Sequence, residues 1–294
     1  MNEKPKISQE MIRLYDEYTH LTLNRRGFIE KLAAIAGGSA AAYAIVPLLE
    51  ANQARAAVVA EDDARVSGET ITWPGADGVT MSGYLVAPAD ARGDLPAVVV
   101  IHENRGLNGH IRDVARRLAL EGFLALAPDF LAPAGGTPED ENRGREMISA
   151  LDQPQTVANS VATVAFLASH DRSNGRVGAV GFCWGGAMVN QTAIHSDALD
   201  AGVAYYGRTP DPSEAGRIKA RMLLHYAGLD ERINAGIPEY EEALKAAGVE
   251  HEIHVYEGVN HAFNNDTSAA RYDQAAADLA WSRTVAFLKG ALSA

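Results

Sequence analysis

The sequence predicts an α/β protein whose doubly wound, mostly parallel sheet is preceded by an antiparallel hairpin. Past residue 66, short apolar runs rich in β-branched residues alternate with segments in which apolar residues recur every three or four positions. Near-continuous apolar runs suit strands buried on both faces of a parallel sheet, and the intervening pattern suits helices packed on that sheet. The 294 residues, 47% of them hydrophobic, can bury one large core.

The strands and helices can be placed in order along the chain. Residues 69–75 and 80–88 alternate apolar and polar side chains around the turn dipeptide Asp77-Gly78, which predicts the hairpin. The buried strands are expected at 95–103, 123–130, 176–182, 201–207, 221–228 and 251–257, and the helices at 111–122, 156–170, 184–195, 238–248 and 271–292. Residues 131–144 read as a long irregular loop, of the kind that builds sites at the carboxyl edge of such a sheet.

The first 56 residues differ from the rest and are read as a separate segment, with the α/β domain spanning 57–294. Arg25-Arg26, the charge-free stretch 33–49 and the small-x-small pattern Ala54-Arg55-Ala56 together resemble a twin-arginine export signal. Such a leader engages the export machinery and predicts a periplasmic protein. The alternative is a retained N-terminal helical segment on a cytoplasmic protein. Stable membrane insertion is not expected, because Gly37-Gly38 and Pro47 interrupt the apolar stretch.

Charge and motif content narrow the classes of partner. The formal net charge of −12 argues against nucleic acid and anionic lipid, since both select a basic surface. The chain has one cysteine and lacks HExxH, CxxC and P-loop signatures. The sequence therefore predicts neither a metal nor a cofactor, and the expected ligand is a small molecule.

The single cysteine lies at a strand-to-helix junction that reads GFCWGG, residues 181–186. A sharp turn there holds a nucleophile in a strained backbone conformation, and Gly181 and Gly185 supply the small residues that the turn requires. The helix start favours a thiolate at Cys183 and offers the N–H of Trp184 to an oxyanion. Cys183 is therefore a candidate nucleophile, against the alternative of an inert buried cysteine.

The acid and base of a hydrolase triad should follow the nucleophile in that order. Asp230 follows the expected strand 221–228, and His261 follows 251–257, as this order requires. Each residue alone has an ordinary interpretation, a helix N-cap for Asp230 and a polar loop residue for His261. The histidines at 225, 251 and 254 are weaker candidates because they lie within strands.

A second motif, IHENRG at 101–106, follows the strand expected at 95–103. This loop supplies the other oxyanion N–H in such folds, so Asn104 or Arg105 could provide it. Glu103 is either a base or a solvated turn residue, and spacing alone does not choose between them.

Taken together, IHENRG, GFCWGG, the Asp of GLDER and the His of EGVNHAF resemble the dienelactone hydrolase family (carboxymethylenebutenolidases) of the α/β-hydrolase fold over about residues 66–292. The resemblance implies a Cys183-His261-Asp230 triad that opens an ester or lactone through an acyl-thioester. It also implies that Glu103 holds and deprotonates the thiol.

The resemblance has limits at the substrate. Family members hold a substrate carboxylate with two arginines; Arg145 matches the first, with Arg143 as the alternative, but the second falls at Asn265. A neutral or differently placed substrate is therefore expected. Arg105 and Tyr206 are further candidates for substrate binding, although Tyr206 and Trp184 are equally consistent with core aromatic residues. The alternative functions are an inactive small-molecule-binding protein and a thiol redox sensor on the same fold.

Overall fold

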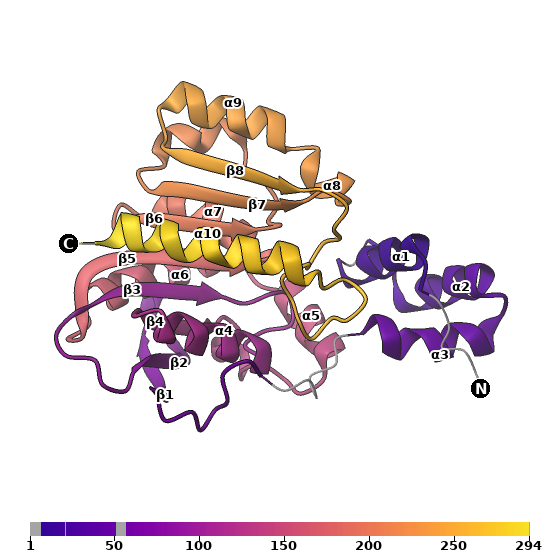
Figure 1. The fold of residues 1–294 in the computed structure, drawn as a ribbon, viewed down its shortest axis with the longest axis horizontal. Helices are drawn as coiled ribbons and strands as arrows, with labels where there is room; N and C mark the ends of the chain where they lie inside the picture. The colour runs from indigo at the N-terminus through magenta and orange to yellow at the C-terminus, as the bar shows by residue number, and fades with distance from the viewer. Residues whose placement is uncertain (1–6, 21, 51–56, 294) are drawn as a thin grey trace.

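A computed structural model describes residues 7–20, 22–50 and 57–293. Across these residues eight strands form a single sheet in the order β1-β2-β4-β3-β5-β6-β7-β8. The strands are β1 Val66–Pro74, β2 Thr80–Pro88, β3 Leu95–Ile101, β4 Leu124–Asp129, β5 Ser173–Phe182, β6 Ala201–Tyr205, β7 Arg221–Ala227 and β8 His251–Tyr256. β2 pairs antiparallel with both β1 and β4, and all other neighbours are parallel. The predicted hairpin and doubly wound sheet are confirmed (Figure 1).

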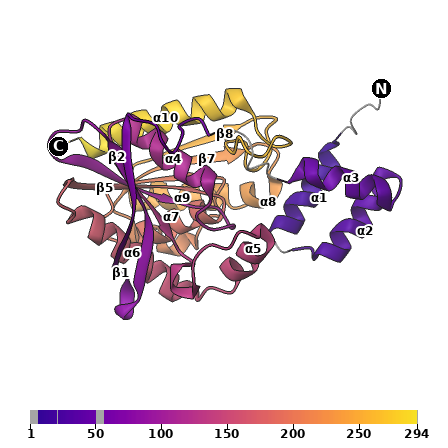
Figure 2. The same cartoon turned by 90° about the horizontal axis from the view of Figure 1, so that it is seen from below.

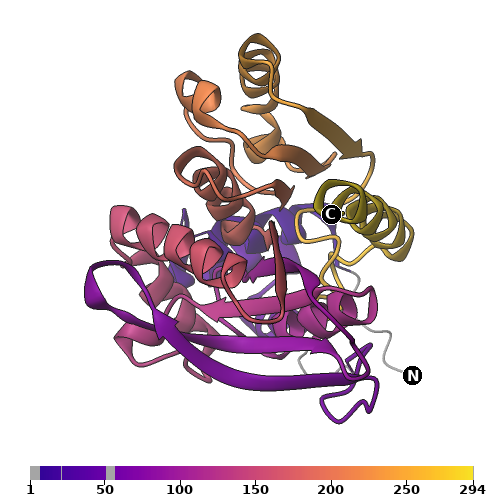
Figure 3. The same ribbon diagram turned by 90° about the vertical axis from the view of Figure 1, so that its left-hand side faces the viewer.

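Helices cover both faces of the sheet (Figure 3). The main ones are α4 Gly109–Leu120, α6 Gln153–Ala168, α7 Trp184–His195, α9 Ile237–Ala247 and α10 Gln274–Leu292. Alternate residues of β3 point to opposite faces, as the pleat of a strand dictates. Val98 and Val100 belong to a core cluster that includes residues of α4 and α10, whereas Val99 and Ile101 belong to one that includes residues of α6, α7 and α9.

Two expectations need correction. The long loop ends earlier than predicted, because Asp140 caps a helix, α5 Glu141–Ser149, by accepting from the N–H of Asn142 at 2.8 Å. Asp and Asn are common both in loops and at the N-caps of helices. The polar composition of residues 131–144 therefore did not reveal that a helix begins within them. β8 is not buried on both faces, since it is the edge strand of the sheet and only Tyr256 is buried in it.

The short elements complete the connections between strands and helices. They are the single-turn helix α8 Glu231–Asn234 and the 3₁₀ turns η1 Ala76–Gly78, η2 Ala132–Ala134 and η3 Pro212–Arg217. α8 follows β7, so it stands at the edge of the sheet where Asp230 was expected.

Three helices precede the α/β domain: α1 Gln9–Thr19, α2 Arg25–Ala36 and α3 Ser39–Leu49. They share an apolar cluster of their own, built around Tyr15, Phe28, Leu32 and Leu49. Figures 1 and 2 show them beyond the ends of the parallel strands, with α1 against the domain. Arg25 and Arg26 begin α2 and are exposed, whereas the expected cleavage pattern Ala54-Arg55-Ala56 lies outside the described residues.

No single helix in the described ranges is both long and apolar enough to cross a membrane. α2 and α3 pass the same test only as a pair, which is bent by 110° at Gly37-Gly38.

Candidate active site

Cys183 stands at a sharp turn between β5 and α7. Its backbone has φ 56° and ψ −113°, a strained conformation for a residue with a side chain. A Cβ on Gly181 would lie 2.1 Å from the carbonyl oxygen of Gly185, and a Cβ on Gly185 would lie 2.3 Å from that of Ile101. The turn therefore needs both glycines, as the sequence predicted, and it aims the buried thiol at the carboxyl edge of the sheet.

His261 and Asp230 reach the same edge from two other loops. Asp230 follows β7 and caps α8, and one of its carboxylate oxygens accepts from the N–H of Ile233 at 3.3 Å. Its other oxygen, Oδ2, lies 2.5 Å from Nδ1 of His261, on the loop after β8. Asp230 is thus both a helix cap and the partner of the imidazole. The pairing places the proton on Nδ1 and turns Nε2 of His261 toward the site.

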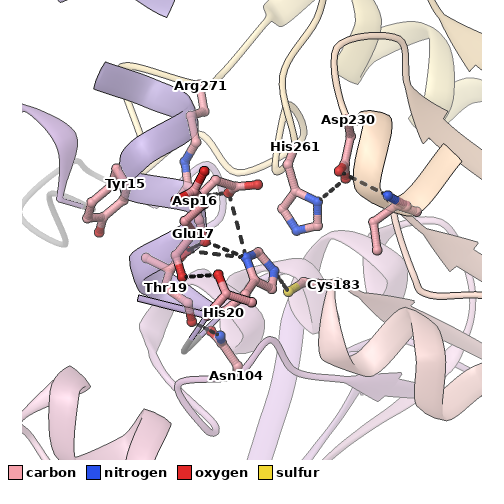
Figure 4. Close-up of polar contacts among 12 residues, drawn as sticks. Tyr15, Asp16, Glu17, Thr19, His20, Asn104, Cys183, Asp230, His261 and Arg271 are labelled. Atoms are coloured by element: carbon pink, nitrogen blue, oxygen red, sulfur yellow. Dashed lines mark hydrogen bonds and ion pairs between the residues drawn. The ribbon is translucent and has the colours of Figure 1, made fainter. Parts of the chain in front are cut away.

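A second imidazole, His20 at the end of α1, contacts the thiol directly (Figure 4). Its Nε2 lies 3.3 Å from Sγ of Cys183, and its ring stands edge-on to that of His261 with centroids 4.7 Å apart. His20 was not among the predicted site residues, because it lies in the segment interpreted as a leader. Only the length and polar patterning of residues 11–20 set that segment apart from an ordinary leader.

Burial and the two imidazoles have opposite effects on the thiol. Burial would raise the pKa of Cys183, whereas the facing His20 and His261 lower it to about 6. Burial would likewise lower the pKa of His261, but the carboxylates of Asp16 and Asp230 and the thiolate of Cys183 hold it well above its ordinary value. The arrangement favours a thiolate facing a protonated imidazole near neutral pH.

Glu103, expected to hold the thiol, is buried in the loop after β3 and engaged elsewhere in this structure. Its Oε2 accepts from Nδ2 of Asn265 at 2.7 Å. Asn265, the residue at the position of the family's second arginine, therefore acts as a donor to this carboxylate. Glu103 lines the small space shared by His20, Cys183 and His261, so the loop does bring it to the site.

The expected oxyanion donors flank the thiol. Trp184 is the first residue of α7, and the first N–H groups of a helix have no acceptor within the helix. Asn104 lines the same cavity as Cys183, and its side chain donates to the carbonyl oxygen of Thr19 at 2.7 Å. Asn104 and Trp184 therefore both border the space beside the thiol, and their role as oxyanion donors stays a prediction.

A cavity of about 630 Å³ opens beside the thiol. Trp184, Met188 and Tyr206 contribute apolar surface to it, whereas Arg145 and Arg208 contribute charge. The hydroxyl of Tyr206 is buried and has no hydrogen-bond partner among the described residues. Tyr206 and Trp184 therefore line the site, in addition to packing in or against the core.

The three candidate arginines lie in different places. Arg145 faces the cavity and stacks on Tyr18, with 4.4 Å from its guanidinium carbon to the ring centroid. Arg143 is exposed and pairs with Glu146. Arg105 is buried behind the thiol, where its guanidinium lies 3.1 Å from the carboxylate of Glu141 and donates to the hydroxyl of Tyr15. Of the two alternatives left open by the sequence, Arg145 is the one placed to meet a substrate.

Two groups of side chains in the described part of the chain bring possible metal ligands within 4.8 Å of one another. One comprises His20, Cys183 and His261, and the other comprises Asp16, Asp230 and His261. The first is a nitrogen and sulfur set of the type that zinc accepts. A metal ion bound there would be coordinated by the sulfur of Cys183, which would then be unavailable as a nucleophile.

Comparison with known proteins identifies the family of this chain. The model of the dienelactone hydrolase family matches residues 81–292, and a second model, described as YqhI-like, matches residues 2–37. An Escherichia coli K12 protein described as a "putative carboxymethylenebutenolidase" is 36% identical over 243 residues, covering 78% of this chain and 88% of that protein. A protein of Saccharolobus solfataricus with the same description is 32% identical over 251 residues, covering 72% and 95%.

A solved structure gives the same result. The crystal structure described as a "putative dienelactone hydrolase" from Klebsiella pneumoniae is 31% identical and has a TM-score of 0.69, covering 76% of this chain and 98% of that one. The part of the chain that the family model matches contains the elbow, Asp230 and His261, and excludes all three helices of the N-terminal segment, α1 to α3. The chain therefore belongs to the dienelactone hydrolase family, has the α/β-hydrolase fold and is a hydrolase acting on carboxylic ester bonds.

Proposed function

We propose that this protein hydrolyses a carboxylic ester or lactone with Cys183 as the nucleophile, through an acyl-thioester. The observation that carries the proposal is the strained elbow, which aims a buried thiol of lowered pKa at the imidazole paired with Asp230. A thiolate is a much better nucleophile than an alcohol near neutral pH. A cysteine that only filled the core would need neither the strained backbone nor the two imidazoles.

In the first half of the reaction, the thiolate adds to the carbonyl carbon and the carbonyl π electrons move to oxygen. We assign the stabilisation of this oxyanion to the backbone N–H groups of Trp184 and Asn104, which line the cavity beside the thiol. When the intermediate collapses, the bond to the leaving oxygen breaks, and that oxygen takes the proton from Nε2 of His261. The products are a thioester on Cys183 and a neutral His261.

In the second half, water is the nucleophile. Nε2 of the neutral His261 takes a proton from water, and the resulting hydroxide adds to the thioester carbonyl. Collapse breaks the carbon–sulfur bond, releases the carboxylic acid and restores the thiolate facing a protonated His261. Asp230 holds the imidazole in the required tautomer in both halves.

The cavity suits an acyl group of moderate size. Trp184 and Met188 offer apolar surface, and the charged side chains of the lining are of both signs: Arg145, Arg208 and Arg232 with Asp211 and Glu214. Asn265 is uncharged and donates to Glu103, so it offers no cation at the position of the family's second arginine. An uncharged ester or lactone, or one whose carboxylate reaches an arginine of the cavity, suits this arrangement.

A twin-arginine leader and a periplasmic location remain predictions about the same protein. What supports them is the exposed Arg25-Arg26 pair at the start of α2, followed by the apolar residues of α3. The export machinery would recognise this pair on the folded chain.

The test of the nucleophile is Cys183→Ala assayed on an activated ester such as p-nitrophenyl acetate. Turnover is expected to fall by about a thousandfold or more, because the substituted chain has no group to form the thioester. Intact-mass analysis of the unsubstituted protein during turnover should show an added acyl group, which C183A should lack. Unchanged turnover in a folded C183A protein would contradict the proposal.

A further inference from the structure

We propose that His20, contributed by the N-terminal helix α1, is a further catalytic residue that acts as the acid–base partner of the Cys183 thiol. The inference rests on the proposed function, since it assigns a partner to the nucleophile proposed above. It concerns a residue outside the part of the chain that the dienelactone hydrolase model matches.

The contacts of His20 determine which of its nitrogens faces the sulfur. Nδ1 lies 2.8 Å from the backbone carbonyl oxygen of Asp16. A carbonyl only accepts, so Nδ1 carries a proton and donates to it. Nε2, 3.3 Å from Sγ of Cys183, is then left either to accept the thiol proton or, once protonated, to donate to the thiolate. One proton is shared between nitrogen and sulfur in both cases.

The position of His20 is set by contacts along the whole of α1 rather than by one bond. The carbonyl oxygen of Thr19 accepts from Asn104 at 2.7 Å, and Asp16 pairs with Arg271 at 3.1 Å. The hydroxyl of Tyr15 accepts from Arg105 at 3.1 Å, so the helix is also held by the loop that contains Glu103. Asn104, Arg105 and Arg271 lie in two loops that border the site, so these contacts fix the imidazole relative to the sulfur; Figure 4 shows Asn104 and Arg271 beside the helix.

The helix forms a wall of the substrate cavity and leaves the cavity open. Thr19 and His20 line the same space of about 630 Å³ as Cys183 and Trp184. The side chain of His20 remains 16% exposed, although it touches the buried sulfur. An acyl group therefore has room beside the thiol while α1 is in place, so α1 does not block the site.

The two imidazoles can divide the proton transfers between them. Nε2 of His261 is buried and has no hydrogen-bond partner within the described ranges, whereas Nε2 of His20 contacts the sulfur. We assign the thiol proton to His20, which holds it while the thiolate attacks and donates a hydrogen bond to the thiolate again when the carbon–sulfur bond breaks. His261 then protonates the leaving oxygen and later accepts a proton from water, so each transfer has one donor and one acceptor.

Titratable groups from every neighbouring element surround the pair of His20 and Cys183. Asp16 and Glu17 lie on α1 itself, and the others come from the loops after β3 and β8, from α5, from the segment after β6, and from the end of β7 with α8. They are Glu103, Arg105, Arg145, Tyr206, Arg208, Asp211, Glu214, Asp230, Arg232, His261 and Arg271. A measured pH dependence therefore has to be assigned by comparing variants, not from a single curve.

The experiment compares His20→Gln with His195→Gln in the full chain. His195 is a matched control, because it ends helix α7 and its Nδ1 also contacts the carbonyl oxygen four residues before it, at 2.9 Å. His195 is exposed and lies at the opposite end of α7 from Cys183. The readouts are the pH dependence of Cys183 alkylation by iodoacetamide, which needs no turnover, and the acylation and deacylation rates with p-nitrophenyl acetate. A chelator is present throughout to keep metal off the thiol.

For H20Q we expect the midpoint of alkylation to move up by about one pH unit, which lowers the rate below that midpoint about tenfold. Acylation should slow about tenfold or more, and hydrolysis of the acyl-enzyme should slow by less, because its attack by water depends on His261 and only the departure of the sulfur involves His20. H195Q should match the unsubstituted protein. In His20→Ala, added imidazole should restore part of the acylation rate, which a purely structural role would not allow.

An alkylation profile and acylation rate for H20Q that equal those of H195Q would overturn the role of His20. Faster acylation in H20Q would also overturn it, because His20 would then be inhibitory. The C183A protein distinguishes failure of the proposed function from failure of the role of His20. If C183A keeps its turnover, the nucleophile is wrong, whereas an inactive C183A with an unaffected H20Q contradicts the role of His20 alone.

Discussion

The sulfur of Cys183 lies in a buried position that would ordinarily keep it protonated. The imidazoles of His20 and His261 counter that effect and lower the pKa of the thiol to about 6. The start of helix α7 also favours the thiolate. A thiol with this pKa is ionised near neutral pH before a substrate arrives, as the proposed attack on an ester requires.

The pH dependence of thiol reactivity follows from this lowered pKa. The thiolate of Cys183 should predominate above about pH 6 and be lost as the pH falls through that value. The rate of iodoacetamide alkylation should therefore rise with pH to a plateau, with its midpoint near 6. The raised pKa of His261 should preserve the thiolate–imidazolium pair into the alkaline range, where loss of that proton would then reduce ester turnover.

The control for this alkylation is the C183A protein, which contains no cysteine because Cys183 is the single cysteine of the chain. A midpoint near that of an ordinary cysteine, about 8.5, would show that the imidazoles do not lower the thiol pKa in solution.

Some residues of the site could be predicted from the sequence and others could not. Cys183, Asp230 and His261 each follow a recognisable strand, in a fixed order along the chain, so they could be predicted to lie at the same edge of the sheet. His20 has no such motif, because its place depends on how α1 docks against loops far away in the sequence. The donor role of Asn265 toward Glu103 depends in the same way on tertiary structure.

At the scale of elements, the turn from β5 to α7 depends on close backbone approach. Gly181 and Gly185 face each other across the turn, and Gly185 also lies against the end of β3. No side chain fits in either gap without moving backbone atoms. The thiol is therefore positioned by the packing of two strands and one helix, not by its own loop alone.

Gly181→Ala should lower the free energy of unfolding by about 2 kcal/mol or more, because its Cβ would meet backbone atoms that cannot turn aside. Ester turnover should fall with it, since the turn must open. Urea unfolding measures the first effect and p-nitrophenyl acetate the second. Gly290→Ala in α10 is the control: its Cβ meets nothing within 4 Å, and stability should rise by about 0.5–1 kcal/mol. Equal stabilities of the two variants would be inconsistent with a tight elbow.

The sequence predicted the buried strands more reliably than the elements at the margin of the domain. Continuous apolar runs identified β3 to β7, because burial on both faces removes the polar positions that would confuse the pattern. α5 begins within a polar stretch that also resembles a loop, and β8 is an edge strand with an exposed face. The start of α5 and the exposure of β8 were predicted wrongly, because they depend on the elements packed against them in the fold and not on their own residues alone.

At the scale of the whole molecule, the N-terminal segment has two competing interpretations. As a leader it would be removed near residue 56, and His20 would be lost with it. Against this, α1 to α3 have a shared apolar cluster, and α1 contacts two loops of the site, those after β3 and β8. The match of residues 2–37 to a YqhI-like model adds that this stretch resembles a sequence unit in its own right.

We therefore predict that the functional protein keeps residues 7–50. Intact-mass analysis of protein from its native host should give about 31.3 kDa, the mass of the whole chain, rather than that of a chain starting near Ala57. Fractionation of the same cells tests export separately, because a protein can cross the membrane with its leader attached. A native chain that starts near Ala57 and still shows the alkylation midpoint near 6 would contradict both the retention of α1 and the catalytic role of His20. The mass and the midpoint must therefore be measured on the same sample, since only together do they show whether the helix beside the thiol belongs to the working enzyme.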